Sequence, residues 1–111
     1  MIKASLIIED YLNNNEVFNK KSSLNRDNTF DRYIKLKEEL RKIKIDLSTS
    51  DLNNFEESNI LVYVNVPKKI LFIKEKFYIV FLVENKSIYP QNKNFKILNK
   101  FNLIFTWDDT L

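Results

Sequence analysis

The chain has 111 residues, which is enough for one domain and too few for two full ones. Its hydrophobic fraction of 44% and aromatic fraction of 14% can supply a core, so the composition excludes a disordered chain. The net charge is +3, with acids and bases interleaved, and this weak surplus does not indicate a nucleic-acid-binding protein. We therefore expect a single domain over residues 1–111 and no nucleic-acid partner.

Three residue types are missing, and each absence excludes a class of functional site. The sequence contains no cysteine, no histidine and no glycine. Without cysteine there are no disulfides and no thiolate zinc sites, and without histidine the commonest general base and metal ligand is lost. Without glycine, neither a dinucleotide-binding GxGxxG turn nor a P-loop can form. Any site must therefore be built from carboxylates, hydroxyls, amides and basic side chains.

The N-terminal segment predicts a first strand followed by a long polar loop. Residues 2–8 end in three consecutive apolar side chains, and acids follow too soon for a signal peptide. Glu9, Asp10 and the triplet Asn13, Asn14 and Asn15 then predict a polar loop that reaches to about Asp27, and a loop of this length inside a compact domain is usually functional or mobile. Arg26 and Asp27 near its end could face a ligand, although the start of the next helix is the favoured interpretation.

Residues 28–42 have the periodicity of an amphipathic helix. The apolar stripe consists of Phe30, Tyr33, Ile34, Leu36, Leu40 and Ile43. Asp31 near the start and Arg41 and Lys42 at the end complement the helix dipole. The segment therefore predicts a crossover helix whose charged residues form a solvated face.

Two further strands and a short link follow this helix. Residues 43–47 alternate apolar and polar side chains, which predicts a more exposed strand. The hydroxyl-rich residues 48–51 favour capping of a short helical turn over sugar or phosphate binding. Residues 60–64 predict another strand, which ends before Pro67 because proline has no amide donor. Residues 68–76 are short for a crossover helix, so a single turn or an irregular link is expected.

Residues 77–83 form the longest apolar run and predict the central strand of the domain. An unbroken run rich in β-branched and aromatic side chains indicates a strand buried on both faces. It falls far short of the roughly 20 residues needed to cross a bilayer, so no transmembrane segment is expected. Glu84 is the first polar side chain past this strand. Because ligands bind beyond the carboxyl ends of strands in open α/β sheets, Glu84 is the main candidate for catalysis.

The C-terminal segment adds a short helix and a last strand. Residues 92–100 predict the helix, with Phe95 and Leu98 facing inward, and residues 103–105 predict the strand. Strands and helices then alternate through most of the chain. This order predicts an α/β fold with a parallel sheet and right-handed crossovers.

Polar residues at the predicted strand ends are the candidates for chemistry. They are Glu9 with Asp10, Asn65, Glu84 with Asn85, and Asp108 with Asp109. A carboxylate at the edge of an apolar strand is partly desolvated, which raises its pKa and makes it a better base near neutral pH. An ordinary strand-terminating residue is the alternative for Glu84. Asp108 and Asp109 could hold a hard cation, but adjacent acids point in different directions on an extended chain, so no metal is predicted.

Five blocks of the sequence together carry a family resemblance. They are residues 24–28 (LNRDN), 45–49 (IDLST), 65–69 (NVPKK), 81–90 (FLVENKSIYP) and 105–111 (FTWDDTL), of which the last two are the most specific. In this order, and over nearly the whole chain, they resemble glycosyltransferase family ten, the bacterial α-1,3-fucosyltransferase-like enzymes.

The resemblance implies a Rossmann-like fold and candidate site residues. Members of the family pair two Rossmann-like domains in the GT-B arrangement, with the acceptor side on the N-terminal domain and GDP-fucose on the C-terminal one. Their general base is a glutamate just after a strand of the N-terminal domain, commonly between Gly and Asn. Glu84 and Asn85 match the acid and the amide, whereas Val83 departs from the Gly. The resemblance thus makes Glu84 catalytic and Asn85, Asn65 and Arg26 acceptor-binding.

The implied reaction is an inverting transfer of fucose from GDP-fucose to a glycan acceptor, as in polysaccharide biosynthesis. Glu84 would remove a proton from the acceptor hydroxyl as it attacks the anomeric carbon of the donor sugar. Basic groups on the other domain would stabilise the diphosphate, with no metal strictly required. We therefore expect residues 1–111 to be the acceptor-side domain of a truncated enzyme, inactive alone, with an apolar patch exposed where the donor domain is missing.

Two other functional classes stay open at this point. A small non-enzymatic α/β module would bind a carbohydrate or a protein as a soluble monomer, without a second domain. A product of a broken reading frame would bind nothing and would fold poorly. The cytoplasm is the expected compartment because the chain has no cysteine and no predicted membrane span, and peripheral contact with the inner membrane face stays open.

Overall fold

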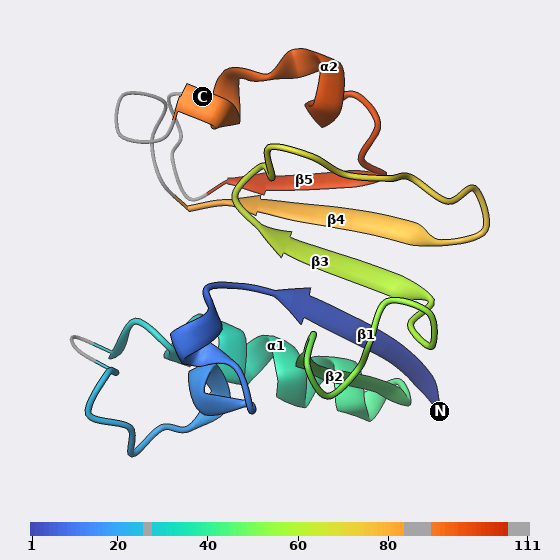
Figure 1. Ribbon diagram of the computed structural model, residues 1–111. Coiled ribbons are helices and arrows are strands. Elements are labelled where there is room, and N and C mark those ends of the chain that lie inside the picture. The colour runs from blue at the N-terminus through green and yellow to red at the C-terminus, as the bar shows by residue number, and fades with distance from the viewer. Residues whose placement is uncertain (26–27, 84–89, 107–111) are drawn as a thin grey trace.

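The computed structural model describes residues 1–25, 28–83 and 90–106, which form a five-stranded sheet with helices packed against it (Figure 1). Every strand runs parallel to its neighbours. The strands are β1 (Ile2–Ile7), β2 (Ile45–Thr49), β3 (Ile60–Val64), β4 (Phe77–Leu82) and β5 (Leu103–Thr106), in the order β2-β1-β3-β4-β5. The predicted α/β fold with a Rossmann-like parallel sheet is confirmed.

One long helix and several short ones connect the strands. They are α1 (Asp31–Lys42), α2 (Phe95–Leu98) and the 3-10 turns η1 (Asp10–Leu12), η2 (Glu16–Phe18) and η4 (Pro90–Lys93). Helix α1 therefore begins at Asp31 rather than at residue 28. Lys44 has a φ of 64°, so the chain turns directly after the helix. The next strand consequently starts at Ile45, two residues later than predicted, and Ile43 lies exposed before it.

The segment between β1 and α1 is more structured than the predicted polar loop over residues 9–27. Its described part folds into η1 and η2, and these turns bury Leu12 and Val17 in the core. Asn14 and Asn15 adopt positive φ angles between the two turns. The two apolar pairs Tyr11–Leu12 and Val17–Phe18, set among polar residues, carry neither a helical nor a strand period, so the sequence pattern did not indicate the burial of Leu12 and Val17.

Strand β4 is buried as predicted, but it is not the central strand. The middle position belongs to β3, which pairs with β1 on one side and with β4 on the other. Strand β4 in turn pairs with β5, and its residues Tyr78, Val80, Phe81 and Leu82 are buried. A long apolar run indicates that a strand is buried on both faces, but it does not show which of several buried strands lies in the middle of the sheet. The sequence of β3 is an unbroken apolar run as well.

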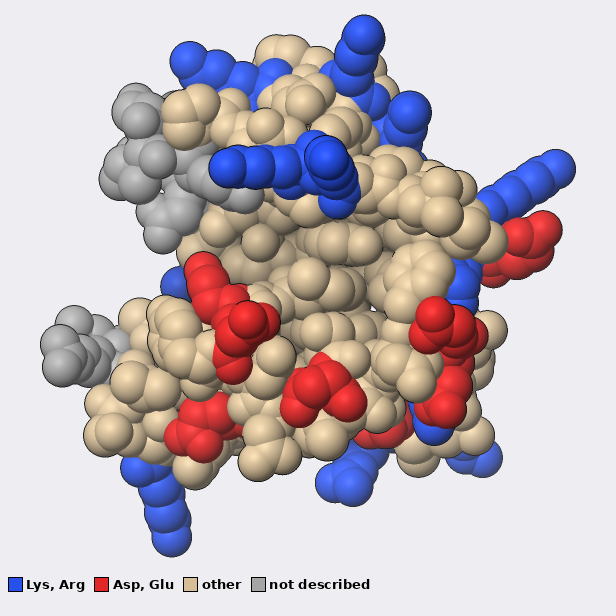
Figure 2. All heavy atoms as spheres, in the orientation of Figure 1, with Lys and Arg blue, Asp and Glu red and all other residues tan. Residues whose placement is uncertain are grey.

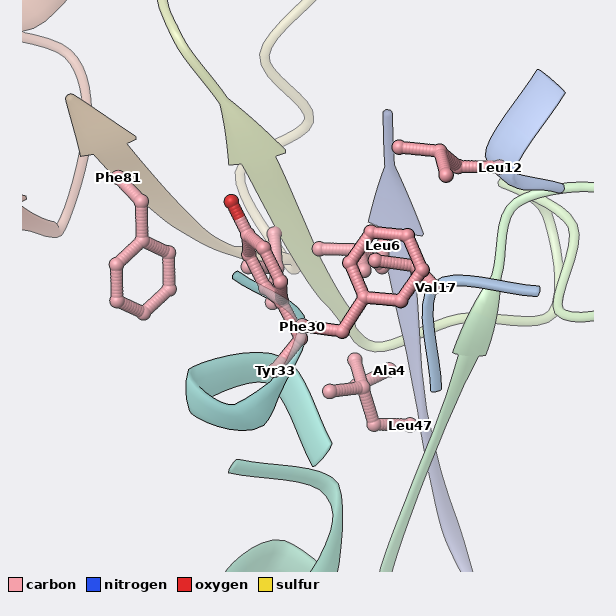
Figure 3. Close-up of a cluster of buried hydrophobic side chains, with 9 residues drawn as sticks. Ala4, Leu6, Leu12, Val17, Phe30, Tyr33, Leu47 and Phe81 are labelled. Atoms are coloured by element: carbon pink, nitrogen blue, oxygen red, sulfur yellow. The ribbon is translucent and has the colours of Figure 1, made fainter. Parts of the chain in front are cut away.

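A cluster of buried side chains lies between α1 and one face of the sheet (Figure 3). Its members are Ala4, Leu6, Leu12, Val17, Phe30, Tyr33, Leu47, Val62 and Phe81. Ala4 and Leu6 reach this face because alternate residues of a strand point the same way. Phe30 and Tyr33, at the start of α1, lie against them in the close-up, so this end of the helix is anchored to the sheet.

The opposite face of β3 and β4 is covered by the link between these strands, residues 65–76, and by residues 90–101. The buried cluster there consists of Leu61, Val66, Tyr78, Val80, Leu82, Leu98 and Phe101. The Tyr78 hydroxyl accepts a hydrogen bond from the Ile73 N–H at 2.8 Å and donates one to the Leu71 carbonyl at 3.0 Å. These bonds fix the link over the sheet, and its predicted irregular form is confirmed.

The charges are segregated, and the expectation that they are interleaved is wrong. Residues 65–106 contain eight lysines and two glutamates, whereas acids and bases nearly balance in residues 1–64. Figure 2 shows basic side chains without acidic neighbours at the top of the view, over η4, α2 and the β3–β4 link, whereas acidic residues lie mostly in the lower part, from which other basic side chains also project. The net charge of the whole chain conceals this difference because it averages the two halves.

We predict that Leu6→Ala lowers the free energy of unfolding by about 2–5 kcal/mol, because Leu6 is fully buried and its truncation leaves a cavity in the core. Leu71→Ala is the matched control, since Leu71 is 70% exposed, and it should change that free energy by less than about 0.5 kcal/mol. Urea denaturation measures both values. Equal losses in the two variants would contradict the placement of the core.

Candidate functional site

The strand order creates a switch point between β1 and β3. The chain leaves β1 for β2 on one side and then returns to form β3 on the other side, so β1 and β3 are neighbours. In open α/β sheets of this order, ligands bind beyond the carboxyl ends of the strands at such a point. Glu9 and Asp10 follow β1, and Asn65 follows β3. We call this edge of the sheet, from Thr49 of β2 to Val83 after β4, the carboxyl rim.

Asn65 links the ends of β3 and β4 on the carboxyl rim. Its φ of 65° lies in the left-handed region, which asparagine tolerates better than most residues. Its backbone N–H donates to the Phe81 carbonyl at 2.7 Å, and its Oδ1 accepts from the Val83 N–H at 2.9 Å. The structure therefore gives Asn65 a positioning role. Its predicted contact with an acceptor stays a prediction.

Asn92 extends this link to the layer above the sheet. The side chain is 1% exposed, and its Nδ2 donates to Asn65 Oδ1 at 3.1 Å while its Oδ1 accepts from the Val66 N–H at 2.8 Å. The Asn65–Asn92 pair thus joins β3, β4 and η4. Nothing in the local sequence distinguished Asn92 from the many other asparagines of the chain, because its partners lie far away in sequence.

A second asparagine holds the end of β2. The Asn15 N–H donates to Thr49 Oγ1 at 3.0 Å, and the Thr49 N–H donates to Asn15 Oδ1 at 2.9 Å. The Asn15 side-chain amide also reaches Ser48 Oγ at 3.4 Å. Thr49 belongs to β2, and the predicted short turn follows it, since the Leu52 and Asn53 N–H groups both donate to the Thr49 carbonyl. The Thr49 hydroxyl bonds to Asn15 after β1 and does not cap this turn. The hydroxyls instead tie η2 to the carboxyl rim.

Asp51 adds a carboxylate beside this pair. Its two oxygens accept from the Asn14 N–H at 3.2 and 3.0 Å. Desolvation alone would raise the pKa of Asp51, but hydrogen bonds from the Thr49 hydroxyl and the Asn14 N–H together lower it below its ordinary value of 3.8. Asp51 therefore stabilises the rim in its charged form.

Asparagine supplies the turn geometry that glycine usually provides. The chain contains no glycine, yet the described residues with positive φ are Asn14, Asn15, Asn28, Lys44 and Asn65. The short polar side chain of asparagine can hydrogen-bond locally in the left-handed region. At Asn15 and Asn65, one residue therefore provides both the turn and a polar group on the rim.

The other predicted site residues lie outside the residues that the structure describes. These are Glu84, Asn85, Arg26, Asp108 and Asp109. Val83, the residue before Glu84 in sequence, is described and is bonded to Asn65. Within residues 1–25, 28–83 and 90–106, no three acidic side chains gather into a possible metal site. In the described residues, the candidate site therefore consists of the carboxyl rim and of the hydrogen bonds that asparagine and threonine residues make along it.

An apolar groove borders the same sheet on the α1 face. A hollow of about 350 Å³ is lined by Leu36, Leu40, Ile60, Val62, Ile79, Phe81, Leu103 and Phe105. A second hollow of about 320 Å³ adjoins it, since both are lined by Leu36 and Phe81. Figure 1 shows that α1 lies along β1 and β2 and away from β5. The groove forms where the helix diverges from the sheet.

Tyr33 lies between the groove and the carboxyl rim. It lines the second hollow, and Figure 3 shows its hydroxyl directed toward the carboxyl ends of the strands. The sequence pattern placed Tyr33 only in an apolar stripe. The hydroxyl of Tyr33 was the feature of the sequence that could have indicated a role beyond packing, because a buried tyrosine hydroxyl usually has a hydrogen-bond partner.

Comparison with known proteins does not place the chain in a family. No family model, no curated protein and no solved structure matches it. In the described part of the chain, no helix combines the length and the apolar character that a bilayer span requires.

We predict that Asn65→Ala lowers the free energy of unfolding by about 2–4 kcal/mol, because it removes the acceptor of two hydrogen bonds and puts alanine at positive φ. Asn65→Gly can keep the positive φ angle, and it should lower the free energy of unfolding by about 1–3 kcal/mol. The exposed Asn99 gives the control variant Asn99→Ala, with an expected change below about 0.5 kcal/mol. If Asn65→Gly is as stable as the wild type in urea, the carboxamide bonds do not hold the rim.

The stability contribution of Asp51 should depend on pH. A carboxylate whose pKa is lowered by folding stabilises the fold above its unfolded pKa, and this contribution is lost as pH falls through the folded pKa. We predict that wild type exceeds Asp51→Asn in thermal midpoint near neutral pH and that the gap closes below about pH 3.8. Thermal melts monitored by circular dichroism across this range measure the gap. A constant gap would contradict the role of the charged form.

Proposed function

We propose that this chain is the acceptor-side domain of a fucosyltransferase-like glycosyltransferase, which transfers fucose from GDP-fucose to a glycan acceptor with inversion. The observation that supports this is the bond between Asn65 and the backbone of Val83, the residue before Glu84. It fixes the end of β4 at the carboxyl rim. A glutamate just past a strand of the acceptor domain is the arrangement that the family resemblance implies.

The polar groups of the rim also suit a ligand that is rich in hydroxyls. Asparagine amides and threonine hydroxyls both donate and accept hydrogen bonds, as sugar hydroxyls do. Asn15, Thr49 and Asn65 place such groups along one edge of the sheet. In this proposal Asn65, Asn85 and Arg26 contact the glycan, and Asn65 also positions the rim.

In the proposed reaction, an acceptor hydroxyl attacks the anomeric carbon of the donor sugar. The bond from that carbon to the diphosphate oxygen breaks, and the carboxylate of Glu84 takes the hydroxyl proton. The products are the fucosylated glycan and GDP. One five-stranded sheet makes half of a GT-B arrangement, so the groups that hold GDP come from a second domain, and this chain alone has no transfer activity. We place the reaction in the cytoplasm.

The chain joined to a family-ten donor domain tests this proposal. We predict that Glu84→Gln in the joined protein lowers the rate of GDP release from GDP-fucose about 10²–10⁴-fold, the contribution of a positioned general base. Glu75→Gln is the matched control, because Glu75 is an exposed glutamate just before β4, at the other end of the strand, and this variant should keep the wild-type rate.

Two results would count against the proposal. An unchanged rate in Glu84→Gln would remove this residue from the mechanism. No transfer by a folded joined protein would favour the alternative, a non-enzymatic α/β module that binds a carbohydrate or a protein.

A further inference from the structure

A lysine-rich surface covers the outer side of the layer above β3 and β4. The inner side of this layer forms the buried cluster that contains Tyr78 and Phe101. The outer side carries the exposed residues Lys68, Lys69, Leu71, Lys93, Phe95, Lys96 and Lys100, which we call the lysine surface. In Figure 2, lysines project from the upper part of the molecule, where this layer lies.

The two segments that build the lysine surface are in direct contact. Gln91 Nε2 donates to the Pro67 carbonyl at 3.1 Å, next to Lys68 in the chain. The Lys100 ammonium lies 6.0 Å from the centre of the Phe72 ring. The lysines of residues 65–76 and of residues 90–101 therefore share one side of the molecule, although they are far apart in sequence.

Three of these lysines lie around η4 and α2, and all three are exposed. Lys93 ends η4, Lys96 lies in α2, and Lys100 follows two residues after α2. Leu98 and Phe101 from the same stretch are buried in the layer. The same packing that covers the sheet therefore gathers positive charge on the outside.

The positive charge of this surface is not balanced by neighbouring acids in the described structure. The ion pairs within the described ranges are Lys3–Glu57, Lys37–Asp46 and Lys42–Glu39, and all lie outside residues 65–106. Glu75 is the acidic residue that the structure describes in this half of the chain. Lysines held on one side repel one another, so an anionic partner would relieve this repulsion.

Two apolar side chains accompany the lysines. Leu71 is 70% exposed and Phe95 is 63% exposed, so the prediction that Phe95 faces inward is wrong. A basic surface with exposed aromatic and leucine side chains is typical of segments that lie in the membrane interface. A nucleic-acid surface fits less well, because residues 65–106 contain no arginine, the residue that best matches phosphate and base edges.

We propose that the lysine surface docks this domain on a membrane that contains anionic lipids. The lysines face the headgroup phosphates, and Phe95 and Leu71 enter the interfacial region. The apolar groove lies on the opposite face of the sheet and stays accessible in this orientation. This inference does not rest on the proposed sugar transfer, and either can fail without the other.

Binding of the 111-residue chain to vesicles tests the proposal. The probes are phosphatidylcholine vesicles with and without phosphatidylglycerol, separated by sedimentation at low and high salt. We expect binding only to the anionic vesicles, and less of it at high salt. Each lysine near an anionic membrane surface contributes about fivefold to the affinity. The triple variant Lys93→Glu/Lys96→Glu/Lys100→Glu should therefore bind anionic vesicles about 100-fold more weakly, or weaker still.

A matched variant tests whether vesicle binding depends on the lysine surface or only on the net charge of the chain. Lys20→Glu/Lys21→Glu/Lys35→Glu changes the charge equally at exposed lysines outside the lysine surface, and it should lose no more than about fivefold. Phe95→Ser should weaken binding to anionic vesicles at both salt concentrations, since its contribution is apolar. Circular dichroism confirms that each variant is folded.

Three results would overturn the proposal. The first is no binding of the wild type to anionic vesicles. The second is an equal loss in the two triple variants, which would show that only net charge matters. The third is tighter binding to a mixed-sequence DNA duplex than to the vesicles, which would assign the lysine surface to nucleic acid.

Discussion

The carboxamide of Asn65 joins the ends of β3 and β4 to η4 in the layer above the sheet. Its oxygen accepts from Val83 after β4 and from Asn92 of η4, and Asn92 in turn holds Val66 after β3. The ends of two neighbouring strands and the layer above them are thus fixed by one pair of amides. The bond to Val66 is buried and the other two are part-buried, and leaving them unmade would be costly, because a polar group removed from water without a partner loses its hydration without compensation.

The absence of glycine explains why asparagine occupies these positions. A parallel sheet needs abrupt turns where its strands end, and such turns often require a positive φ. Asn15 and Asn65 meet this requirement and keep a polar side chain that reaches the neighbouring strand end. The side chains of the carboxyl rim therefore hold neighbouring strand ends together and also form a row of hydrogen-bonding groups. The lysine surface and the apolar groove lie on the two sides of the sheet that meets this rim.

Local patterns predicted the elements whose sequence signal is continuous. The bounds of β3 were predicted correctly because an unbroken apolar run stops before Asn65 and Pro67. Helix α1 was predicted from its stripe, and the parallel sheet followed from the alternation of strands and helices. The position of Asn65 on the rim followed from its place at a strand end. Its acceptor role, and every role assigned to Glu84, stay predictions.

Long-range contacts account for what the patterns did not predict. Leu12, Val17, Thr49 and Asn92 take their roles from partners brought close only by the folded sheet. Hydrogen exchange at the Val66 and Val83 amides, measured by NMR, tests the central claim most directly. We predict exchange as slow as that of amides in the middle of β4, because both N–H groups are bonded to asparagine side chains. Exchange as fast as in an unstructured peptide would contradict a rim held by Asn65 and Asn92.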